Sequence, residues 1–423
     1  FHMSESKKTG TEKLKNTIFQ FILKYFCITS LDAISRNDII GWRIVFTLTT
    51  DAKQVHNMEK KQGKNSQNLK AENRGLLFRF LATRQQTSRT ELAKISGLNK
   101  MTVSNITADF LAKQYVIEST MNATRNNPIM LELSPNAPKI IGLLIRRTRV
   151  AVALCNFHLD ILSYDAEELH DATQEILLRT VKKLVDRFMR FGNILGIGIG
   201  SIGPVDIHQG IILDPPDFYG IRDVEIVDYL QKLYHLPVYL DYHYNCEALA
   251  ELYYGNGSNY QNFLFLGIED GLGLSVVIAN QLLSNYTGYE SEFGYLCVNF
   301  DDKTPRTGVP SGYLGAYVSF DASQKDQIRE NISILSFSLA GLCNILNPQA
   351  IIIGDSRGVL SNTDLIAMQN QINQQILSRD YRHIEICRAY RSGNFETASC
   401  AISIIQHVFS GELIFSAGET DRP

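Results

Sequence analysis

Four residues between positions 101 and 108 have side chains that suit contact with the edges of DNA bases. Met101, Ser104, Asn105 and Ala108 are small, apolar or amide-bearing, and their spacing places them on one side of a helix. An asparagine pairs with the hydrogen-bonding groups of adenine in the major groove, and apolar side chains meet the methyl group of thymine. A helix that presents these residues to solvent could therefore read a DNA sequence.

The surrounding residues predict a helix-turn-helix over residues 88–113. Ser88 with Glu91 three residues later is the pattern of a capping box, which marks the start of a helix. Residues 97–99 form a short turn, and Asn99 is placed to cap a second helix that begins at Lys100. Apolar residues follow the helical repeat in both helices, namely Leu92, Ala93 and Ile95, then Val103, Ile106 and Phe110. The alternative is an ordinary helical hairpin.

The flanking segments favour the DNA-binding alternative. A helix from Asn73, with apolar residues at 76, 77, 80 and 81, is expected to pack beneath the other two helices. Two alternating segments, Tyr115–Ser119 and Ile129–Leu133, enclose the polar stretch Thr120–Asn127 and predict a β-wing. Arg125 at its tip is placed to reach a phosphate or the minor groove. Three helices with this wing predict a winged helix-turn-helix.

Charge is distributed unevenly along the chain. Residues 58–140 carry 13 Lys and Arg against 6 Asp and Glu, whereas residues 141–423 carry 20 against 33. A basic head on an acidic body indicates that only the head meets a polyanion such as DNA. Small helical domains are often basic by chance, so the charge supports the motif and does not stand alone.

Cysteine usage and hydropathy indicate a cytoplasmic protein. The seven cysteines never form a C-x-x-C pair, which is typical of reduced thiols rather than of a disulfide framework or a cysteine-rich zinc site. No apolar run approaches the roughly 20 residues that a membrane-spanning helix needs. Residues 1–66 are interpreted as an appended or poorly ordered segment. The head is then expected at residues 67–136 and the body at 137–423.

Strand-like and helical stretches alternate through the body and predict an α/β fold. Two strand-like runs lie in Lys139–Leu162 with a turn near Asn156, and helices are expected at 173–191, 224–234, 245–254 and 326–346. A formal G-x-G-x-x-G spans residues 198–203. It is not a dinucleotide-binding turn, because Pro204 and another strand follow it instead of a helix whose N-terminus could hold a pyrophosphate.

Residues 67–409 resemble the ROK family of repressors, open reading frames and sugar kinases. The winged-helix head of its sugar-responsive repressors, of the xylose and N-acetylglucosamine type, is similar to NRGLLFRFL, SRTELAKISGLNKMTVSNI and NNPIMLELSP. Successive blocks of the family's body are similar to GIGSIGPVD, EALAELYYGNG, GLGLSVVI, GYESEFGYL and LNPQAIIIGD. The resemblance implies an actin-like body of two lobes, each with a ribonuclease H-like fold, behind a winged helix-turn-helix head.

The chain departs from the family's kinases where the chemistry takes place. The kinases hold phosphate on a D-I-G-G-T-K turn, and the matching residues here, 144–149, carry Arg146 and Arg147 in place of the two glycines. Those side chains remove the close backbone approach that a phosphate needs. The N-D-A-N motif with its general base is replaced by residues 242–245, where His243 stands for the aspartate. The resemblance therefore implies no catalytic residues, no phosphoryl transfer and no cofactor.

The family's zinc and sugar sites are also altered. At the positions of the histidine and three cysteines that hold zinc, this chain has Tyr295, Arg306, Gly308 and Tyr313, so we expect no metal. Glu292 retains one of the family's contacts to sugar hydroxyls, and Asp217 stands where a loop asparagine would be. The resulting candidate ligand-binding residues are Asp217, Tyr242, His243, Asn245 and Glu292. The alternative is a cleft that binds nothing in a body that only dimerises.

These patterns predict a DNA-binding transcriptional regulator of carbohydrate-metabolism genes, most simply a repressor that senses a sugar or a related small metabolite. Its partners would be operator DNA and a second copy of the chain, in a homodimer or a tetramer, because palindromic operators need two recognition helices. A sugar kinase with an appended head and an effector-independent DNA-binding dimer remain the alternatives. The candidate DNA-binding residues are Ser88, Lys100, Met101, Thr102, Ser104, Asn105 and Arg125.

Overall fold

The structure is a computed structural model of the chain and describes residues 66–119, 128–269, 271–283, 292–302, 311–318, 328–390 and 393–413. The segment interpreted as an appendage, apart from its last residue, lies outside this range. So does the whole expected turn of the β-wing, residues 120–127, which includes Arg125.

The head begins with α3 (Ser66–Ala82), which starts before the Asn73 predicted from the sequence. The helices α4 (Arg89–Ser96) and α5 (Lys100–Ala112) follow where the sequence predicts them. A small antiparallel sheet has the order β1-β3-β2, with β1 (Thr87–Ser88), β2 (Val116–Glu118) and β3 (Met130–Leu133). Of the predicted helical repeat, Leu77, Leu81, Leu92, Val103, Ile106 and Phe110 are buried, and Leu76, Phe80, Ala93 and Ile95 are half-buried. Phe78, which the predicted repeat did not include, is also fully buried.

The first large sheet of the body has the order β10-β7-β4-β5-β6. Its strands are β4 (Lys139–Ile145), β5 (Arg149–Cys155), β6 (Ile161–Glu168), β7 (Ile194–Ser201) and β10 (Val238–Tyr242). The sequence predicted two strand-like runs between residues 139 and 162, with one turn near Asn156. The structure has a further turn at residues 146–148, so this region contains β4, β5 and the start of β6. A separate hairpin joins β8 (Val205–Asp206) to β9 (Ile211–Ile212).

The glycines of the G-x-G-x-x-G segment serve the packing of β7 rather than a nucleotide. A Cβ added at Gly198 would overlap the backbone carbonyl of Cys400, and one at Gly200 would crowd the Cys400 side chain. After β7 the chain enters the β8–β9 hairpin and no helix follows, so the dinucleotide-binding interpretation is excluded on geometry as well.

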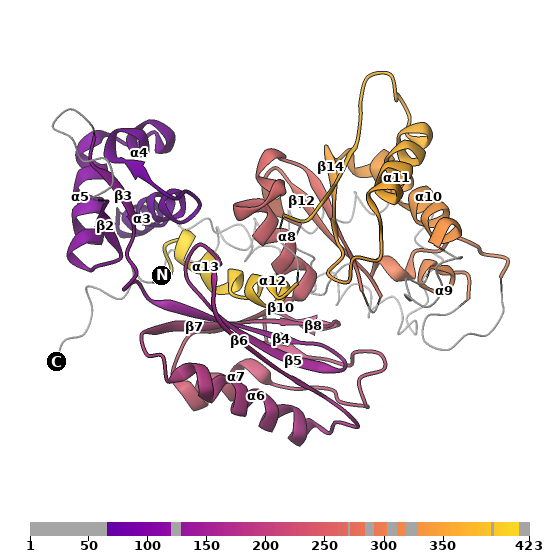
Figure 1. Ribbon diagram of the computed structural model, residues 1–423, viewed down its shortest axis with the longest axis horizontal. Coiled ribbons are helices and arrows are strands. Elements are labelled where there is room, and N and C mark those ends of the chain that lie inside the picture. The colour runs from indigo at the N-terminus through magenta and orange to yellow at the C-terminus, as the bar shows by residue number, and fades with distance from the viewer. Residues whose placement is uncertain are drawn as a thin grey trace, which may run out of the picture. The chain divides into compact units, whose positions relative to one another are not determined.

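The second large sheet has the order β13-β12-β11-β14-β15. Its strands are β11 (Phe263–Ile268), β12 (Leu272–Ile278), β13 (Gln281–Leu282), β14 (Ala350–Gly354) and β15 (Glu385–Arg388). The helices α10 (Ile328–Leu346) and α11 (Asn362–Gln375) cover the outer side of this sheet (Figure 1). This part of the chain also contains three short helices, namely η2 (Asn256–Asn259), η3 (Phe293–Tyr295) and α9 (Leu314–Tyr317).

Helices line both sides of the first sheet. The helices α6 (Gln174–Met189) and α7 (Ile226–Tyr234) cover its outer face, and α12 (Phe395–Ser399) and α13 (Ile402–Phe409) cover the face toward the second sheet (Figure 1). The helix α8 (His243–Tyr254) lies between the sheets and contacts strands of both. It begins two residues before the expected Asn245. We call the parts built on the first and second sheets the first and second lobes.

Candidate functional site

The helix α5 presents the face that the sequence assigns to base contacts. Asn99 caps it by accepting a hydrogen bond from the backbone N–H of Thr102 at 2.8 Å, which fixes where the helix begins. Val103, Ile106 and Phe110 are buried on one side. On the other side Lys100, Met101, Ser104, Asn105 and Ala108 are exposed, and Met101 exposes 76% of its surface. An exposed methionine at the start of a capped helix serves no packing purpose in the chain itself.

The helix α4 is held by Ser88, whose hydroxyl accepts from the Glu91 backbone N–H at 3.2 Å. The carboxylate of Glu91 lies 3.7 Å from Arg84, so Glu91 has another partner than the one a capping box predicts. Ser88 is only 8% exposed, and Thr102 is half-buried. Among the candidate DNA contacts in the described residues, the exposed ones are therefore confined to α5.

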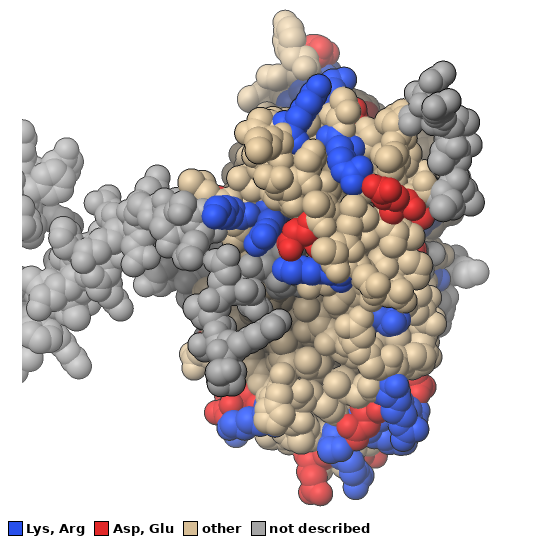
Figure 2. Space-filling view, turned by 90° about the vertical axis from the view of Figure 1, so that its left-hand side faces the viewer, with Lys and Arg blue, Asp and Glu red and all other residues tan. Residues whose placement is uncertain are grey.

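The side of the molecule that carries the head exposes basic groups. Figure 2 shows Lys and Arg side chains spread over a mostly uncharged surface in the upper part of that side, with few acidic side chains among them. Arg89, by contrast, is turned inward to Glu118, at 2.9 Å, and to the Thr107 hydroxyl. It therefore contributes to holding α4, α5 and β2 together.

In the body, the carboxyl ends of parallel strands meet between the lobes. In the first lobe, Ile145 of β4 pairs with Ser201 of β7, and Ser201 pairs with Tyr242 of β10, so these three strands end at one level. In the second lobe, β11 and β14 end at one level, where Gly267 pairs with Gly354. The residues that follow parallel strands in this way form the ligand-binding edge of open α/β sheets.

A buried group of charged residues fills this edge, and we call it the inter-lobe cluster: Arg146, Arg149, Glu247, Glu269 and Glu396. Arg146, which follows β4, is 5% exposed and forms ion pairs with Glu269 after β11 and with Glu396 of α12, the latter at 2.6 Å. Arg149 of β5 forms a second ion pair with Glu396. Glu269 also accepts a hydrogen bond from the Ser356 hydroxyl, after β14. Arg146 thus bridges carboxylates from both lobes.

The charges in the inter-lobe cluster shift one another's pKa values. Burial alone would lower the pKa of Arg146, but the neighbouring Glu396 and Glu269 raise it above its ordinary value. Burial raises the pKa of Glu269 to about 7, against the attraction of Arg146. Burial and the other carboxylates raise the pKa of Glu247 well above its ordinary range, and its Oε1 is buried without a hydrogen-bond partner. Arg146 is therefore a permanent cation beside Glu247 and Glu269, two carboxyl groups whose pKa values burial raises.

The ring of Tyr244 fills the space beside the inter-lobe cluster. A Cβ added at Gly267 of β11 or at Gly273 of β12 would overlap this ring, so the two glycines leave the room that it occupies. The Tyr244 side chain also contacts Arg146, and burial raises its pKa. A tyrosine from α8 thus takes the place over a glycine-lined hairpin where a phosphate could otherwise approach the backbone.

Three of the candidate ligand-binding residues lie at the start of α8 and are largely enclosed. Tyr242 and His243 are buried, and the His243 Nδ1 lies 3.0 Å from the carbonyl oxygen of Ser201. Burial and the charge of Arg146 hold the pKa of His243 well below its ordinary value, so its ring is neutral. Asn245 donates to Asp241 and accepts from the Ser275 hydroxyl at 2.7 Å. The polar groups of His243 and Asn245 are therefore already engaged within the chain.

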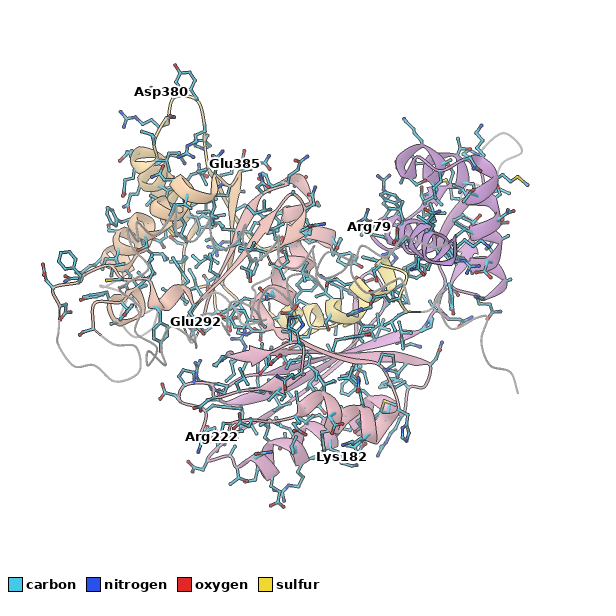
Figure 3. All side chains as sticks on the ribbon, turned by 180° about the vertical axis from the view of Figure 1, so that it is seen from behind. Arg79, Lys182, Arg222, Glu292, Asp380 and Glu385 are labelled. Atoms are coloured by element: carbon cyan, nitrogen blue, oxygen red, sulfur yellow. The ribbon has the colours of Figure 1, made fainter. Side chains whose placement is uncertain are left out.

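The other two candidates, Asp217 and Glu292, are exposed. Asp217 has a positive φ of 55° in the loop after β9, and Arg147 ties this loop to the β4–β5 turn by donating to the carbonyl oxygen of Pro216 at 2.9 Å. Glu292 immediately precedes η3, and Figure 3 shows it apart from the head. These two carboxylates are thus on loops that can meet a ligand from solvent.

A small cavity of about 40 Å³ remains beside the inter-lobe cluster and is lined in part by Glu247, Asp355, Arg388 and Glu396. It has room for little more than water. Within the described ranges, no group of three or more His, Cys, Asp or Glu is arranged to hold a metal ion. In the same part of the chain, no helix is long and apolar enough to cross a membrane.

Comparison with known proteins relates part of the body to a known family. A family model described as "ROK family" matches residues 140–322. Residues 140–322 are a ROK family domain. The xylose repressor of Caldicellulosiruptor bescii is 24% identical over 81% of this chain and 97% of its own length. A ROK family transcriptional regulator, described as a homologue of E. coli MLC, has a TM-score of 0.70 at 19% identity and covers 82% of this chain and 98% of its own. A ROK glucokinase from Streptomyces griseus has a TM-score of 0.56 at 20% identity, over 62% of this chain and 98% of its own.

The body has the actin-like fold that the sequence resemblance implies, and relatives with this fold include both regulators and kinases. The inter-lobe cluster occupies the turn at which the sequence places the lost phosphate site. Of its members, the sequence pointed only to Arg146 and, as part of the replaced turn, Arg149. Glu247, Glu269, Glu396 and the plugging role of Tyr244 were missed, because no local pattern links them. The acidic pair Glu269–Asp270 directly after an apolar strand is the one signal in the sequence that could have indicated this cluster.

Proposed function

We propose that this chain is a DNA-binding transcriptional repressor whose ROK domain senses a sugar or a related metabolite without catalysing a reaction. Residues 67–136 act as a winged helix-turn-helix, residues 137–423 as the sensing body, and residues 1–66 as an appendage. The observation that carries the proposal is the exposed face of α5, where Met101, Ser104 and Asn105 lie opposite a fully buried stripe. Relatives named as xylose repressors support it along nearly their whole length.

The repressor is proposed to bind its operator as a homodimer, or as a tetramer built from two such dimers. One recognition helix covers only a short half-site, and a palindromic operator presents two. Lys100 and Arg125 are assigned to phosphates, and Ser104 and Asn105 to base edges. Because Ser88 is buried, its part in binding is to fix the start of α4, and Thr102 supports the beginning of α5.

Phosphoryl transfer is proposed to be lost in this ROK domain. Three carboxyl groups of the inter-lobe cluster lie where the kinases are expected to hold negatively charged phosphates, and Tyr244 covers the glycines Gly267 and Gly273. A phosphate placed there would have to displace Glu269 and Glu396 from Arg146, whose charge they already neutralise. The glucokinase relative shares the fold. We attribute the proposed lack of kinase activity in this chain to the side chains of the inter-lobe cluster and to Tyr244.

The test of DNA reading is Asn105→Ala. Since Asn105 is exposed on α5 and an asparagine reads adenine, the change should cost about 1–3 kcal/mol at one base position and relax specificity there. Binding of wild type and variant to an operator library with each base pair randomised in turn measures it. Asn370→Ala, an exposed asparagine on α11, is the matched control and should alter nothing.

Arg125→Ala belongs to the same experiment and separates the two kinds of contact. It should weaken binding to all sequences alike. It should also reduce the magnitude of the slope of log affinity against log salt concentration by about one. A uniform loss from Asn105→Ala would mean that another face of α5 reads the bases. If the wild type binds no DNA sequence above background, the repressor proposal fails.

Effector sensing is tested at Glu292. A carboxylate that accepts a hydroxyl hydrogen bond contributes roughly 1.5–3 kcal/mol, so Glu292→Ala should weaken the effector response about tenfold or more. A thermal-shift screen of sugars and sugar phosphates finds the effector, and operator release then gives the response of each variant. Asp380→Ala, an exposed carboxylate on the loop after α11 (Figure 3), is the control. With ATP and magnesium, no compound that binds should yield ADP. A compound whose effect does not change in Glu292→Ala would place the pocket elsewhere. ADP production would support the alternative that the chain is a sugar kinase.

A further inference from the structure

Arg146 is placed to hold the two lobes together. It lies on the β4–β5 turn of the first lobe, and its guanidinium contacts Glu269 at the end of β11 in the second lobe. The same guanidinium contacts Glu396 of α12, which packs on β4 and β5. All three side chains are less than a tenth exposed, so solvent and salt screen these ion pairs little.

The composition of the inter-lobe cluster makes its closed arrangement depend on Arg146. Three carboxyl groups face two guanidinium groups, and Arg149 reaches only Glu396. Removing Arg146 would leave Glu269 facing Glu396 and Glu247 with no cation between the lobes. A buried ion pair that loses one partner leaves an uncompensated buried charge, which is strongly unfavourable. Protonation of Glu269 would relieve this charge but would leave no ion pair to join the lobes, and separation of the lobes would admit water to the carboxylates.

Two helical segments lead from the inter-lobe cluster to the first helix of the head. The helix α8 carries Tyr244 and Glu247 at the inter-lobe cluster, and near its other end Tyr253 contacts Arg79 of α3 and the Phe409 ring of α13. Figure 3 shows Arg79 at the edge of the head that faces the body.

The second segment is α12 with α13, which carries Glu396 in its first turn and ends against α3. The contact with α3 is close. A Cβ added at Gly75 would clash with the backbone of Phe409 and would lie 2.8 Å from the Gly411 nitrogen. Helices that touch at backbone distance move together, because no flexible side chain lies between them to absorb a shift.

We propose that Arg146 is a latch that keeps the two lobes closed without a nucleotide, and that α8 and α12–α13 carry the state of this latch to α3 of the head. The proposal rests on the proposed repressor function only for its consequence at the operator. An effector that favours the open lobes would then release DNA by altering the position of α3, since a ligand shifts an equilibrium only through its different affinity for the two states.

The latch is tested by the distance between the lobes in Arg146→Gln and in Arg149→Gln. Both changes remove one guanidinium from Glu396, but only Arg146 reaches the second lobe, so Arg149→Gln is matched in charge and in partner. Fluorescent dyes on cysteines introduced at Lys182 of α6 and at Asp380, one in each lobe (Figure 3), report the distance by energy transfer. Cys27 and Cys297 are replaced by serine in this background.

Arg146→Gln should lengthen the dye separation and broaden its distribution, whereas Arg149→Gln should match the wild type. An unchanged separation in a folded Arg146→Gln, or an equal change in both variants, would overturn the latch. Thermal melting establishes folding. If Arg146→Gln does not fold, Arg146→Lys decides, because a lysine keeps the charge but lacks the fork that bridges two carboxylates. It should give an intermediate separation, and a wild-type value would refute the proposal.

Transmission to the head is read by hydrogen exchange in residues 66–82 and by operator affinity. Arg146→Gln should speed exchange in α3 and shift the operator dissociation constant about tenfold, a typical coupling between sites, with little change in Arg149→Gln. Open lobes with unaltered α3 exchange would refute the transmission step. If the wild type binds no DNA, the proposed repressor function is refuted. The dye separation and the hydrogen exchange would still test the latch, because neither measurement depends on DNA.

Discussion

Replacing Tyr244 by alanine is expected to lower the free energy of unfolding by about 3–5 kcal/mol, the range for aromatic-to-alanine changes in a core. The ring is buried, and a Cβ at Gly267 or Gly273 of the β11–β12 hairpin would overlap it, so its removal leaves a cavity. Denaturant unfolding measures the change. Tyr381→Ala removes the same side chain at a position that is 92% exposed, and should shift stability by no more than about 0.5 kcal/mol.

A double-mutant comparison ties this loss to the glycine gap. Gly267→Ala alone should be destabilising, because its Cβ overlaps the Tyr244 ring and the core cannot yield. In the Tyr244→Ala background the same change should be tolerated, since the clash has gone. Gly341→Ala on α10, where an added Cβ meets nothing, should be neutral or slightly stabilising. Additive effects of Tyr244→Ala and Gly267→Ala would show that the ring does not occupy this gap.

Replacing Phe78 by alanine is expected to have an effect of similar size, about 3–5 kcal/mol, and also to loosen the head from the body. Phe78 of α3 is fully buried, and its ring packs against Phe110 and Tyr115 of the head and against Phe157 of the body, with ring centroids 5.7, 6.4 and 4.9 Å away. The loss should therefore fall on both parts at once.

Calorimetry distinguishes the two consequences of Phe78→Ala. In the wild type the shared core predicts that head and body melt together, whereas in Phe78→Ala the head should melt in a separate transition at lower temperature. Phe337→Ala, which removes an exposed phenylalanine from α10, should leave a single transition. A single transition in Phe78→Ala with unchanged midpoint would mean that the head is held chiefly by other contacts, such as that between Gly75 and Phe409.

Local signals in the sequence were sufficient to place α4 and α5. Ser88 and Asn99 cap α4 and α5 at the predicted residues, and Val103, Ile106 and Phe110 are buried as their spacing predicts. Caps and helical periodicity act over a few residues, so they are visible in one short stretch of sequence. Where the capping signal is weak, the predicted start of a helix was wrong by two residues. The helix α8 begins at His243 rather than Asn245, after Tyr242, which makes no capping hydrogen bond.

The sequence also carried the resemblance to the ROK family and pointed to the altered cleft through Arg146, Arg147 and His243. It did not reveal what those residues do. Arg146 contacts Glu396, 250 positions later, and Glu269 in the other lobe, and Tyr244 fills a gap that two glycines of a separate hairpin leave open. Such contacts exist only after distant strands have paired and both sheets have closed on α8 and α12. An ion pair or a filled gap depends on separation in space, and periodicity and motif spacing report only separation along the chain.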